Sequence, residues 1–370
     1  MEKVGIIAEY NPFHNGHIYH LNKVKELFPN SIYILILIGN FTQRADASII
    51  NKWDKTKIAL EYGYDLVIEL PYNIATSSAN LYAKGAIDIL NILNCNYLVF
   101  GSESNDIELF KKIVNITNNN NYDIKIKKYL KEGYSYPKSL GLALNELSNI
   151  NIYKPNDVLA LEYVRNIINS KSKIIPISIK RTNEYDDNKI INNIASASFI
   201  RKNINNNIIK DLIPSISYKY IKKINYDDYF KFIKYKIISC NDLINILDMD
   251  DTILNRLKKQ IHKSNNLNEL ILNTKTKKYT YNKIKRILLH ILTDTKKDYN
   301  TNINYIRVLG FTSNGSKVLK EVKKLTNIPI ITKYKKEYDY LFKDDIKASM
   351  LYSLLTDYDY KEDYKSSMKK

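Results

Sequence analysis

The sequence predicts an α/β fold in which a parallel β-sheet is flanked by helices and followed by a mainly helical, basic domain. Short apolar, β-branched runs alternate with amphipathic segments of roughly 10–15 residues through the first part of the chain, as in βαβ units. From about residue 205 onward, the spacing of the apolar residues is mostly helical. The excess of positive charge also lies in that second part.

The length of 370 residues fits two domains at roughly 150 residues each, and we place the boundary between residues 204 and 205. No apolar run approaches the ~18 residues of a membrane span, and the first strand-like segment follows Met1 without the apolar region of a signal peptide. Cys95 and Cys240 are the two cysteines, which excludes a disulfide scaffold and a thiolate zinc site. We therefore expect a cytoplasmic protein.

Continuous apolar runs, which are typical of buried parallel strands, predict five strands in the first domain. They cover residues 4–8, 32–38, 65–70, 97–100 and 174–179. Helical spacing of apolar residues predicts the intervening helices. These cover residues 17–27, 52–62, 78–91 and 157–168. The asparagine-rich segments 115–121 and 203–207 are expected to be loops.

The second domain is expected to be mostly helical. The same spacing predicts helices over residues 216–224, 242–247, 252–261, 281–292 and 317–325. One short strand is expected at residues 328–332. Tyrosines alternate with charged residues over 356–370, which predicts a frayed tail.

The net charge is +18, and its distribution along the chain is uneven. Residues 1–150 carry 15 basic and 15 acidic side chains, whereas residues 201–370 carry 35 basic and 19 acidic ones. A basic half beside a neutral half favours a polyanionic partner such as a nucleic acid. An AT-biased genome would also enrich lysine, but that bias accounts for the abundance of lysine and not for its asymmetry.

The motif with the strongest chemical content is His14-Asn15-Gly16-His17, which follows the first strand and opens the first helix. A helix N-terminus binds phosphate through free backbone N–H groups, and Gly16 lets the backbone approach a ligand closely. The imidazoles of His14 and His17 can stabilise charge that develops on phosphate oxygens. Two other interpretations stay open: a pair of metal ligands without an evident third ligand, or a purely structural turn.

In this strand–turn–helix context, the motif resembles the HxGH signature of the nucleotidyltransferase superfamily, whose members bind ATP and promote attack on its α-phosphate. The longer segment 4–17 resembles the tRNA(Met) cytidine acetate ligase family. Further segments similar to that family span almost the whole chain. They are residues 39–44, 52–53, 65–71, 100–103, 154–157, 179–181, 196–201 and 307–311.

The resemblance implies a Rossmann-like nucleotidyltransferase domain at residues 1–204 and a tRNA-binding helical domain at 205–370. Its implied activity joins acetate to ATP, giving acetyl-adenylate and pyrophosphate. The acetyl group then passes to N4 of the wobble cytidine, position 34, of elongator tRNA(Met), and AMP is released. The implied co-substrate is ATP, accompanied by Mg²⁺. Adenylation needs no protein nucleophile, which agrees with a site built of imidazoles, a helix N-terminus and an arginine.

In that family the ATP site comprises the loop after the first strand and three single positions, and the two histidines of HxGH are its catalytic residues, here His14 and His17. The matching ATP-site residues are Ile7, Ala8, Glu9, Tyr10, Asn11, Pro12, Phe13, His14, Asn15, Gly16, His17, Ile18, Tyr19, His20, Gly101, Asn156 and Arg181. The positions of Gly101 and Arg181 also fit physical expectation, because both follow strands whose carboxyl ends border the ligand site of open α/β sheets.

Other candidate residues admit two interpretations each. Ser196 and Arg201 resemble a second phosphate-binding signature, or Ser196 is a plain helix cap. Arg44 faces substrate or RNA, or it is a solvated loop charge. Trp53 is favoured as a core residue over a base-stacking platform. Glu69 and Glu103 are candidate magnesium ligands at strand ends. At residues 185–187 the sequence Tyr-Asp-Asp departs from the family, where a histidine is expected after the tyrosine.

Two other functions share parts of this pattern. An ordinary nucleotidyltransferase that moves AMP or CMP to a small phosphorylated acceptor would have the same site without needing a large basic domain. An RNA-binding protein with a degenerate nucleotide fold is disfavoured by the intact His14, Gly16 and His17. We therefore predict an ATP-dependent tRNA cytidine acetate ligase.

Overall fold

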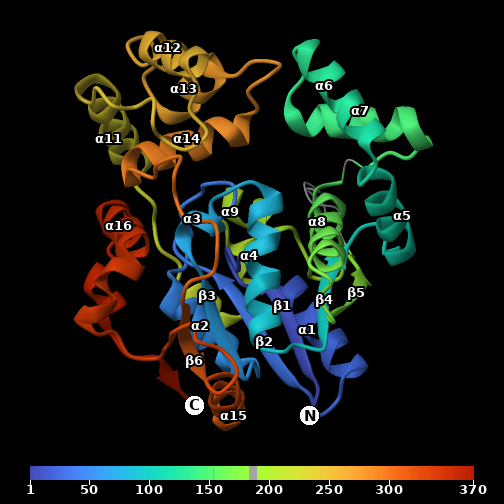
Figure 1. Ribbon diagram of the computed structural model, residues 1–370. Helices are drawn as coiled ribbons and strands as arrows, with labels where there is room; N and C mark the ends of the chain where they lie inside the picture. Colours follow the sequence, from blue (N-terminus) through green and yellow to red (C-terminus); the bar gives the residue numbers. More distant parts are fainter. Residues whose placement is uncertain (153, 183–189) are drawn as a thin grey trace.

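The computed structural model describes residues 1–152, 154–182 and 190–370 (Figure 1). Within these residues an eight-stranded sheet has the order β5-β4-β1-β2-β3-β6-β7, and β8 also pairs with β6. The strands are β1 (Lys3–Ala8), β2 (Ile32–Ile38), β3 (Leu66–Leu70), β4 (Tyr97–Ser102), β5 (Ile175–Lys180), β6 (Ile306–Phe311), β7 (Ile330–Ile331) and β8 (Met368–Lys369). The five N-terminal strands are mutually parallel, which confirms the predicted α/β fold.

The sheet is covered by helices on both faces because its central strand is apolar on both sides. Every residue of β2 is buried. Leu35 and Leu37 pack on one side with α1 (Asn15–Leu27) and α2 (Lys52–Glu61). Ile34 and Ile36 pack on the other side with α4 (Ala79–Ile92) and α8 (Pro155–Asn169). These strands and helices match the predicted ones to within a few residues.

Two groups of helices lie apart from this layered core (Figure 1). The helices not yet given are α3 (Tyr72–Ala75), α5 (Ile107–Thr117), α6 (Asn120–Lys131), α7 (Tyr136–Ser148), α9 (Ala197–Lys202), α10 (Ser215–Lys219), α11 (Tyr226–Ser239), α12 (Asp251–Gln260), α13 (Leu267–Thr274), α14 (Tyr281–Thr293), α15 (Ser313–Val322) and α16 (Asp339–Leu355). Helices α5 to α7 form one group and α11 to α14 the other. No helix of the described residues has the length and apolarity to cross a membrane.

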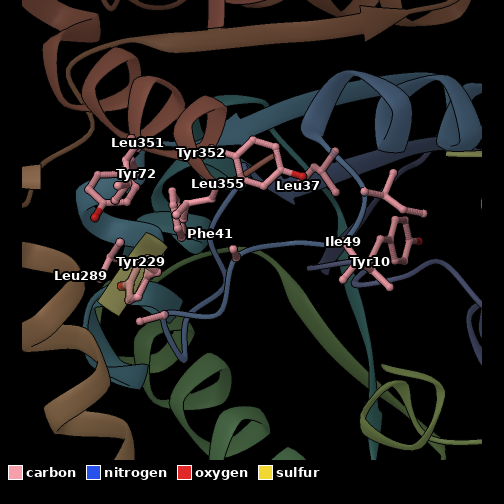
Figure 2. Close-up of a cluster of buried hydrophobic side chains, with 14 of the residues drawn as sticks. Tyr10, Leu37, Phe41, Ile49, Tyr72, Tyr229, Leu289, Leu351, Tyr352 and Leu355 are labelled. Carbon is pink, nitrogen blue, oxygen red and sulfur yellow. The ribbon is translucent and has the colours of Figure 1, made fainter. Parts of the chain in front are cut away.

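The loop after β2 joins the sheet to the C-terminal helices through one continuous apolar cluster (Figure 2). Phe41 of this loop lies among Tyr72, Tyr229 of α11, Leu289 of α14 and Tyr352 of α16. The Tyr72 and Tyr352 rings meet Phe41 edge-on, with centroids 6.2 and 6.0 Å away. The second part of the chain therefore packs directly on the carboxyl ends of the parallel strands.

Strand β6 corrects one prediction about the second part of the chain. The sequence indicated a single short strand at 328–332, but residues 306–311 also form a strand, which pairs antiparallel with β3. Residues 205–370 therefore complete the sheet of residues 1–204. The segment was missed because its apolar run is short and contains Arg307, whose charge is met by Glu69 from the neighbouring strand.

The expected frayed tail is also wrong. Asp363 is completely buried, and its carboxylate lies 2.9 Å from Lys52 Nζ and accepts a hydrogen bond from Trp53 Nε1. Residues beyond it form β8 on the edge of β6. The tail is held in place by buried Asp363, whose partners Lys52 and Trp53 lie about 300 residues away in the sequence.

Three local predictions also need correction. Residues 242–247 form no helix, because the backbone of Leu247 and Asn245 pairs with residues 295 and 297. The predicted helix 216–224 ends at Lys219. The segment 115–121 is mostly helical, since α5 runs to Thr117 and the Asn119 side chain caps α6.

Candidate active site

The strand order places the HxGH loop at the point where ligands bind in open α/β sheets. Strand β1 lies between β2 and β4, so successive connections leave its two sides in opposite directions. The loop containing His14 follows β1, Gly101 lies near the end of β4, and Arg181 follows β5 directly. These three strands are parallel, so their carboxyl ends lie at one edge of the sheet, where open α/β sheets have their ligand crevice.

The histidines of the motif are fixed by hydrogen bonds to the start of α1. His14 Nδ1 accepts a hydrogen bond of 3.0 Å from the backbone N–H of Gly16. His17 Nδ1 in turn accepts one of 3.2 Å from the N–H of His14. Their rings lie 3.8 Å apart between centroids. The two side chains therefore cap the helix reciprocally and share one side of its N-terminus.

Both imidazoles are neutral in this site. Desolvation, followed by the charges of Arg181 and Arg201, lowers the pKa of His14 to about 3. Desolvation also lowers the pKa of His17 well below its ordinary value, and that of His20 to about 4. Because Nδ1 of His14 and of His17 is an acceptor, the ring proton lies on Nε2. Each Nε2–H is then a donor that can meet a phosphate oxygen.

Gly16 is required by the packing of the motif. A Cβ atom at this position would lie 2.8 Å from Cε1 and 3.0 Å from Nδ1 of His14. It would also lie 3.3 Å from the Ile194 side chain. The absence of a side chain is therefore what allows the His14 ring to fold back over the helix start.

Other side chains of the predicted loop pack against the motif or tie it to neighbouring segments. Tyr10 and Phe13 are buried and contact the His17 ring, with centroid distances of 4.7 and 5.7 Å. Asn15 Nδ2 donates to the carbonyl oxygens of Asn193 and Asp211, which ties the helix start to the segment around α9.

The remaining loop positions differ in environment. Ile7 and Ala8 end β1, Pro12 is buried in the loop, and Ile18 and Tyr19 lie partly exposed on α1. Two buried polar atoms next to the motif, Asn11 Nδ2 and His20 Nε2, have no hydrogen-bond partner within the described structure. Such atoms are expected where a polar ligand completes the site.

Gly101 and Arg181 form a second contact of the site. A Cβ atom on Gly101 would lie 3.3 Å from Cγ of Arg181, so the arginine side chain packs across the glycine. The Arg181 N–H donates to the carbonyl oxygen of Ser102 at 3.0 Å. Besides desolvation, the positive charge of Arg181 contributes to the lowered pKa of His14 and of His17.

Asn156 is linked to the loop after β4 by the carboxylate of Glu103. Its Nδ2 donates to Glu103 Oε1 at 2.5 Å, and the N–H of Asp157 donates to the other oxygen at 2.9 Å. The Asp157 carboxylate accepts a hydrogen bond from Ser102 Oγ at 2.6 Å. Glu103 is therefore engaged in fixing the β4 loop to α8.

Glu69 is likewise engaged within the protein. Its carboxylate lies 2.9 Å from Lys52 Nζ and 3.4 Å from Arg307 Nε, and the residue is buried. Within residues 1–152, 154–182 and 190–370, no group of three His, Cys, Asp or Glu side chains is arranged to hold a metal ion. Trp53 is buried beside this cluster, which confirms its interpretation as a core residue.

Helix α9 contributes a tether to the motif loop. Ser196 Oγ accepts a hydrogen bond from the N–H of Phe199 and so caps the helix. Arg201, on the same helix, donates to the carbonyl oxygen of Asn11 at 2.7 Å. The cap interpretation of Ser196 is confirmed, and the cap holds a second guanidinium near His14. Residues 185–187 lie outside the described residues.

Lys55 is a residue that the sequence analysis missed. Its buried Nζ donates to the carbonyl oxygens of Glu9, Ile38 and Gly39, at 3.0, 2.8 and 2.7 Å. Desolvation lowers its pKa to about 7. The available signal was its position on the helical face that also carries Ile58, where a lysine is unexpected. Lys55 therefore links the carboxyl ends of β1 and β2 next to the start of the motif loop.

Glu9, which follows β1 directly, is held by the loop after β2. Glu9 Oε1 accepts a hydrogen bond from the N–H of Gln43 at 2.8 Å. Desolvation raises the pKa of Glu9, and this hydrogen bond and the charge of Arg44 oppose the rise. Arg44 is half-buried in the loop after β2, and its positive charge favours the ionised form of Glu9.

The fold and the geometry of the HxGH loop define a nucleotidyl transferase-type site, and comparison with known proteins agrees. A family model described as HIGH Nucleotidyl Transferase matches residues 1–367. The chain is 40% identical to the tRNA(Met) cytidine acetate ligase of Caldicellulosiruptor saccharolyticus, covering 96% of this chain and 94% of that protein. It is 41% identical to the ligase of the same name from Clostridium perfringens, covering 96% of each.

Solved structures show the same relationship over the whole chain. Thermotoga maritima TmcAL in its apo form superposes with a TM-score of 0.89 at 26% identity, covering 100% of this chain and 99% of that one. The structure of the same protein bound with alpha-thio ATP gives a TM-score of 0.87 at 26% identity, with the same coverage. This chain belongs to the tRNA(Met) cytidine acetate ligase family.

Proposed function

We propose that this chain activates acetate with ATP and transfers the acetyl group to N4 of the wobble cytidine of elongator tRNA(Met). The observation that carries this proposal is the neutral His14–His17 pair at the N-terminus of α1, in a chain that is about 40% identical to tRNA(Met) cytidine acetate ligases over 96% of its length. The ATP analogue bound by Thermotoga maritima TmcAL supports the nucleotide assignment.

In the first step, ATP lies with its phosphates at the start of α1. The Nε2–H groups of His14 and His17 donate to phosphate oxygens, and Arg181 balances the negative charge. An oxygen of acetate attacks the α-phosphorus as the bond to the β-phosphate bridging oxygen breaks. Pyrophosphate leaves with that electron pair. Positioning and charge stabilisation suffice, since acetate itself is the nucleophile.

In the second step, N4 of the cytidine attacks the carbonyl carbon of acetyl-adenylate. The new C–N bond forms as the bond to AMP breaks, and N4 loses a proton. The cytidine must be unstacked to reach the crevice, and single-stranded anticodon loops present bases in that way. The basic residues of 205–370 bind the tRNA backbone, which predicts that tRNA affinity falls steeply with salt.

The site residues stay as the sequence predicts them: residues 7–20 with Gly101, Asn156 and Arg181. We expect Mg²⁺ to arrive with ATP, coordinated mainly by the phosphates. Glu69 and Glu103 are engaged in protein contacts, so no step is assigned to a protein-held ion. We also expect the enzyme to act in the cytoplasm.

The test follows labelled acetate in the presence of ATP, with and without total tRNA. The expected result is AMP formation together with label in tRNA, both lost in His14→Ala and in Arg181→Ala. Lys171→Ala is an exposed control, because Lys171 lies between the end of α8 and the start of β5, at the opposite edge of the sheet from the motif. Acetate-independent transfer of AMP to a small phosphorylated acceptor would contradict the proposal and favour an ordinary nucleotidyltransferase.

A further inference from the structure

A pocket of about 320 Å³ lies between the loop after β2 and the C-terminal helices. Ala45 to Ala47 of the loop form one wall, and residues from the starts of α11 and α13 and from α14 form the others. None of these residues belongs to the predicted ATP site. The pocket is therefore a second candidate binding site.

The chemistry of the lining favours a flat ring with polar edges. Tyr229, Ile271 and Leu288 are buried and give the pocket an apolar floor. Tyr226 is 44% exposed at the pocket, so its ring offers a face to a ligand. Nucleobases bind proteins by stacking on such aromatic faces while their edges form hydrogen bonds.

Polar groups of fixed orientation border this floor. Tyr281 Oη donates to Asn268 Oδ1 at 3.0 Å, so the amide nitrogen of Asn268 is the end that can donate to a ligand. Lys285 forms an ion pair with Asp46 across the pocket wall. A few oriented polar groups around an apolar floor are typical of sites that bind one small ring specifically.

The loop after β2 connects the pocket to the HxGH loop. Ala45 to Ala47 of this loop line the pocket. The same loop donates two hydrogen bonds to the segment after β1, from the N–H of Gln43 to Glu9 Oε1 at 2.8 Å and from the N–H of Ile49 to Asn11 Oδ1 at 2.9 Å. The pocket and the ATP site are thus neighbours on the same edge of the sheet.

The charge of the surrounding chain indicates which kind of molecule supplies the flat ring. Residues 201–370 carry 35 basic and 19 acidic side chains, which favours a polyanion over a neutral metabolite. We propose that this pocket takes an unstacked nucleobase from the single-stranded loop of the tRNA, while ATP occupies the site at α1. This inference rests on the proposed function, because it names where the RNA substrate of that reaction is held.

The first test replaces Tyr226 by alanine. Loss of one base-stacking ring should lower kcat/KM for tRNA by roughly tenfold, and Tyr226→Phe should restore it because the ring face is kept. Acetate-dependent exchange of pyrophosphate into ATP, measured without tRNA, should be unchanged. Tyr235→Ala is the matched control, since Tyr235 lies on the same helix, is 72% exposed and does not line the pocket.

The second test scans the anticodon stem–loop with single abasic nucleotides. One loop position should slow the wild type and Tyr235→Ala by roughly tenfold, yet cause no further loss in Tyr226→Ala. Equal losses in all three proteins at every position would overturn the inference. So would a raised KM for ATP in Tyr226→Ala, which would assign the pocket to adenine.

The two proposals fail in distinguishable ways. Absence of acetate-dependent exchange in the wild type would contradict the proposed function alone. The pocket is then tested by binding of the fluorescently labelled stem–loop RNA to the three proteins. Weaker binding by Tyr226→Ala alone supports the pocket, and equal binding by Tyr226→Ala and the wild type overturns it. Thermal unfolding of each variant verifies that the comparison is made on folded protein.

Discussion

Arg201 donates a hydrogen bond of 2.7 Å to the carbonyl oxygen of Asn11, joining α9 to the loop that precedes the first helix. The two residues are 190 positions apart in the sequence. The contact fixes the loop backbone at one point and holds a positive charge near His14. One side chain therefore serves both the shape and the electrostatics of the candidate ATP site.

Replacement of Arg201 should impair ATP use more than stability. Arg201→Ala releases the loop at Asn11 and removes a positive charge near His14, and small misplacements of a catalytic loop are costly, so kcat/KM for ATP should fall by roughly tenfold or more in the exchange assay. Lys202→Ala is the control, because Lys202 is the exposed next residue of α9. An unchanged exchange rate in Arg201→Ala would show that the tether is dispensable.

A methyl group at Gly16 should displace the His14 ring. Gly16→Ala brings Cβ to 2.8 Å from Cε1 of His14, and we expect at least a roughly tenfold loss of acetate-dependent exchange from the misplaced imidazole. Gly141→Ala is the matched control, since no atom lies within 4 Å of the added Cβ in α7. That control should gain about 0.5–1 kcal/mol of stability. Equal exchange rates in both variants would contradict the packing argument.

The neutral histidines make stability depend on pH. Desolvation lowers the pKa of His14 to about 3, and burial lowers the pKa of His290 to about 4. The unfolded chain takes up these protons near pH 6.5, so the free energy of unfolding should fall as the pH drops from about 6.5 toward 4.

Each such histidine contributes up to about 1.4 kcal/mol per pH unit in that window. Urea unfolding at pH 7, 6 and 5 measures the slope. His14→Gln should have a shallower slope than the wild type below pH 6.5 and no difference in slope above pH 7.5. Identical slopes at low pH would show that His14 is protonated in the folded state.

Loss of the buried Asp363 carboxylate should be strongly destabilising. Asp363→Asn leaves Lys52 and Arg307 with Glu69 as the remaining nearby carboxylate of their ion pairs. Removing one partner of a buried ion pair costs about 3–5 kcal/mol, which urea unfolding at pH 7 measures directly. Asp359→Asn is the exposed control, because asparagine keeps the capping ability of Asp359. A change below about 1 kcal/mol would contradict this account.

Sequence patterns were most informative where the structure depends on neighbours in the chain. The continuous apolar run of β2 and the HxGH loop after β1 both have local causes, and both are found as predicted. Strand β6 and residue Asp363 were missed because their partners, Glu69 and Lys52, lie more than 200 residues away. Local periodicity carries no information about such pairs.

The same distinction between local patterns and distant partners applies to the residues of the candidate site. His14, Gly16 and His17 form a local motif, whereas Lys55 and Arg201 act on backbone carbonyls of distant residues. A carbonyl acceptor leaves no mark in the sequence, because every residue has one. Sequence reasoning can therefore identify the groups that face a ligand more readily than those that hold the loop in place.

The antiparallel pairing of β6 with β3 has a consequence for synthesis of the protein. When the ribosome has made only residues 1–204, the edge of β3 has no partner strand, and Lys52 lacks the Asp363 carboxylate. Unpaired sheet edges promote aggregation. Residues 1–204 therefore stay incomplete until β6 and the segment around Asp363 have emerged. The candidate nucleotide site would then reach its final shape only late in translation, after most of the chain has been made.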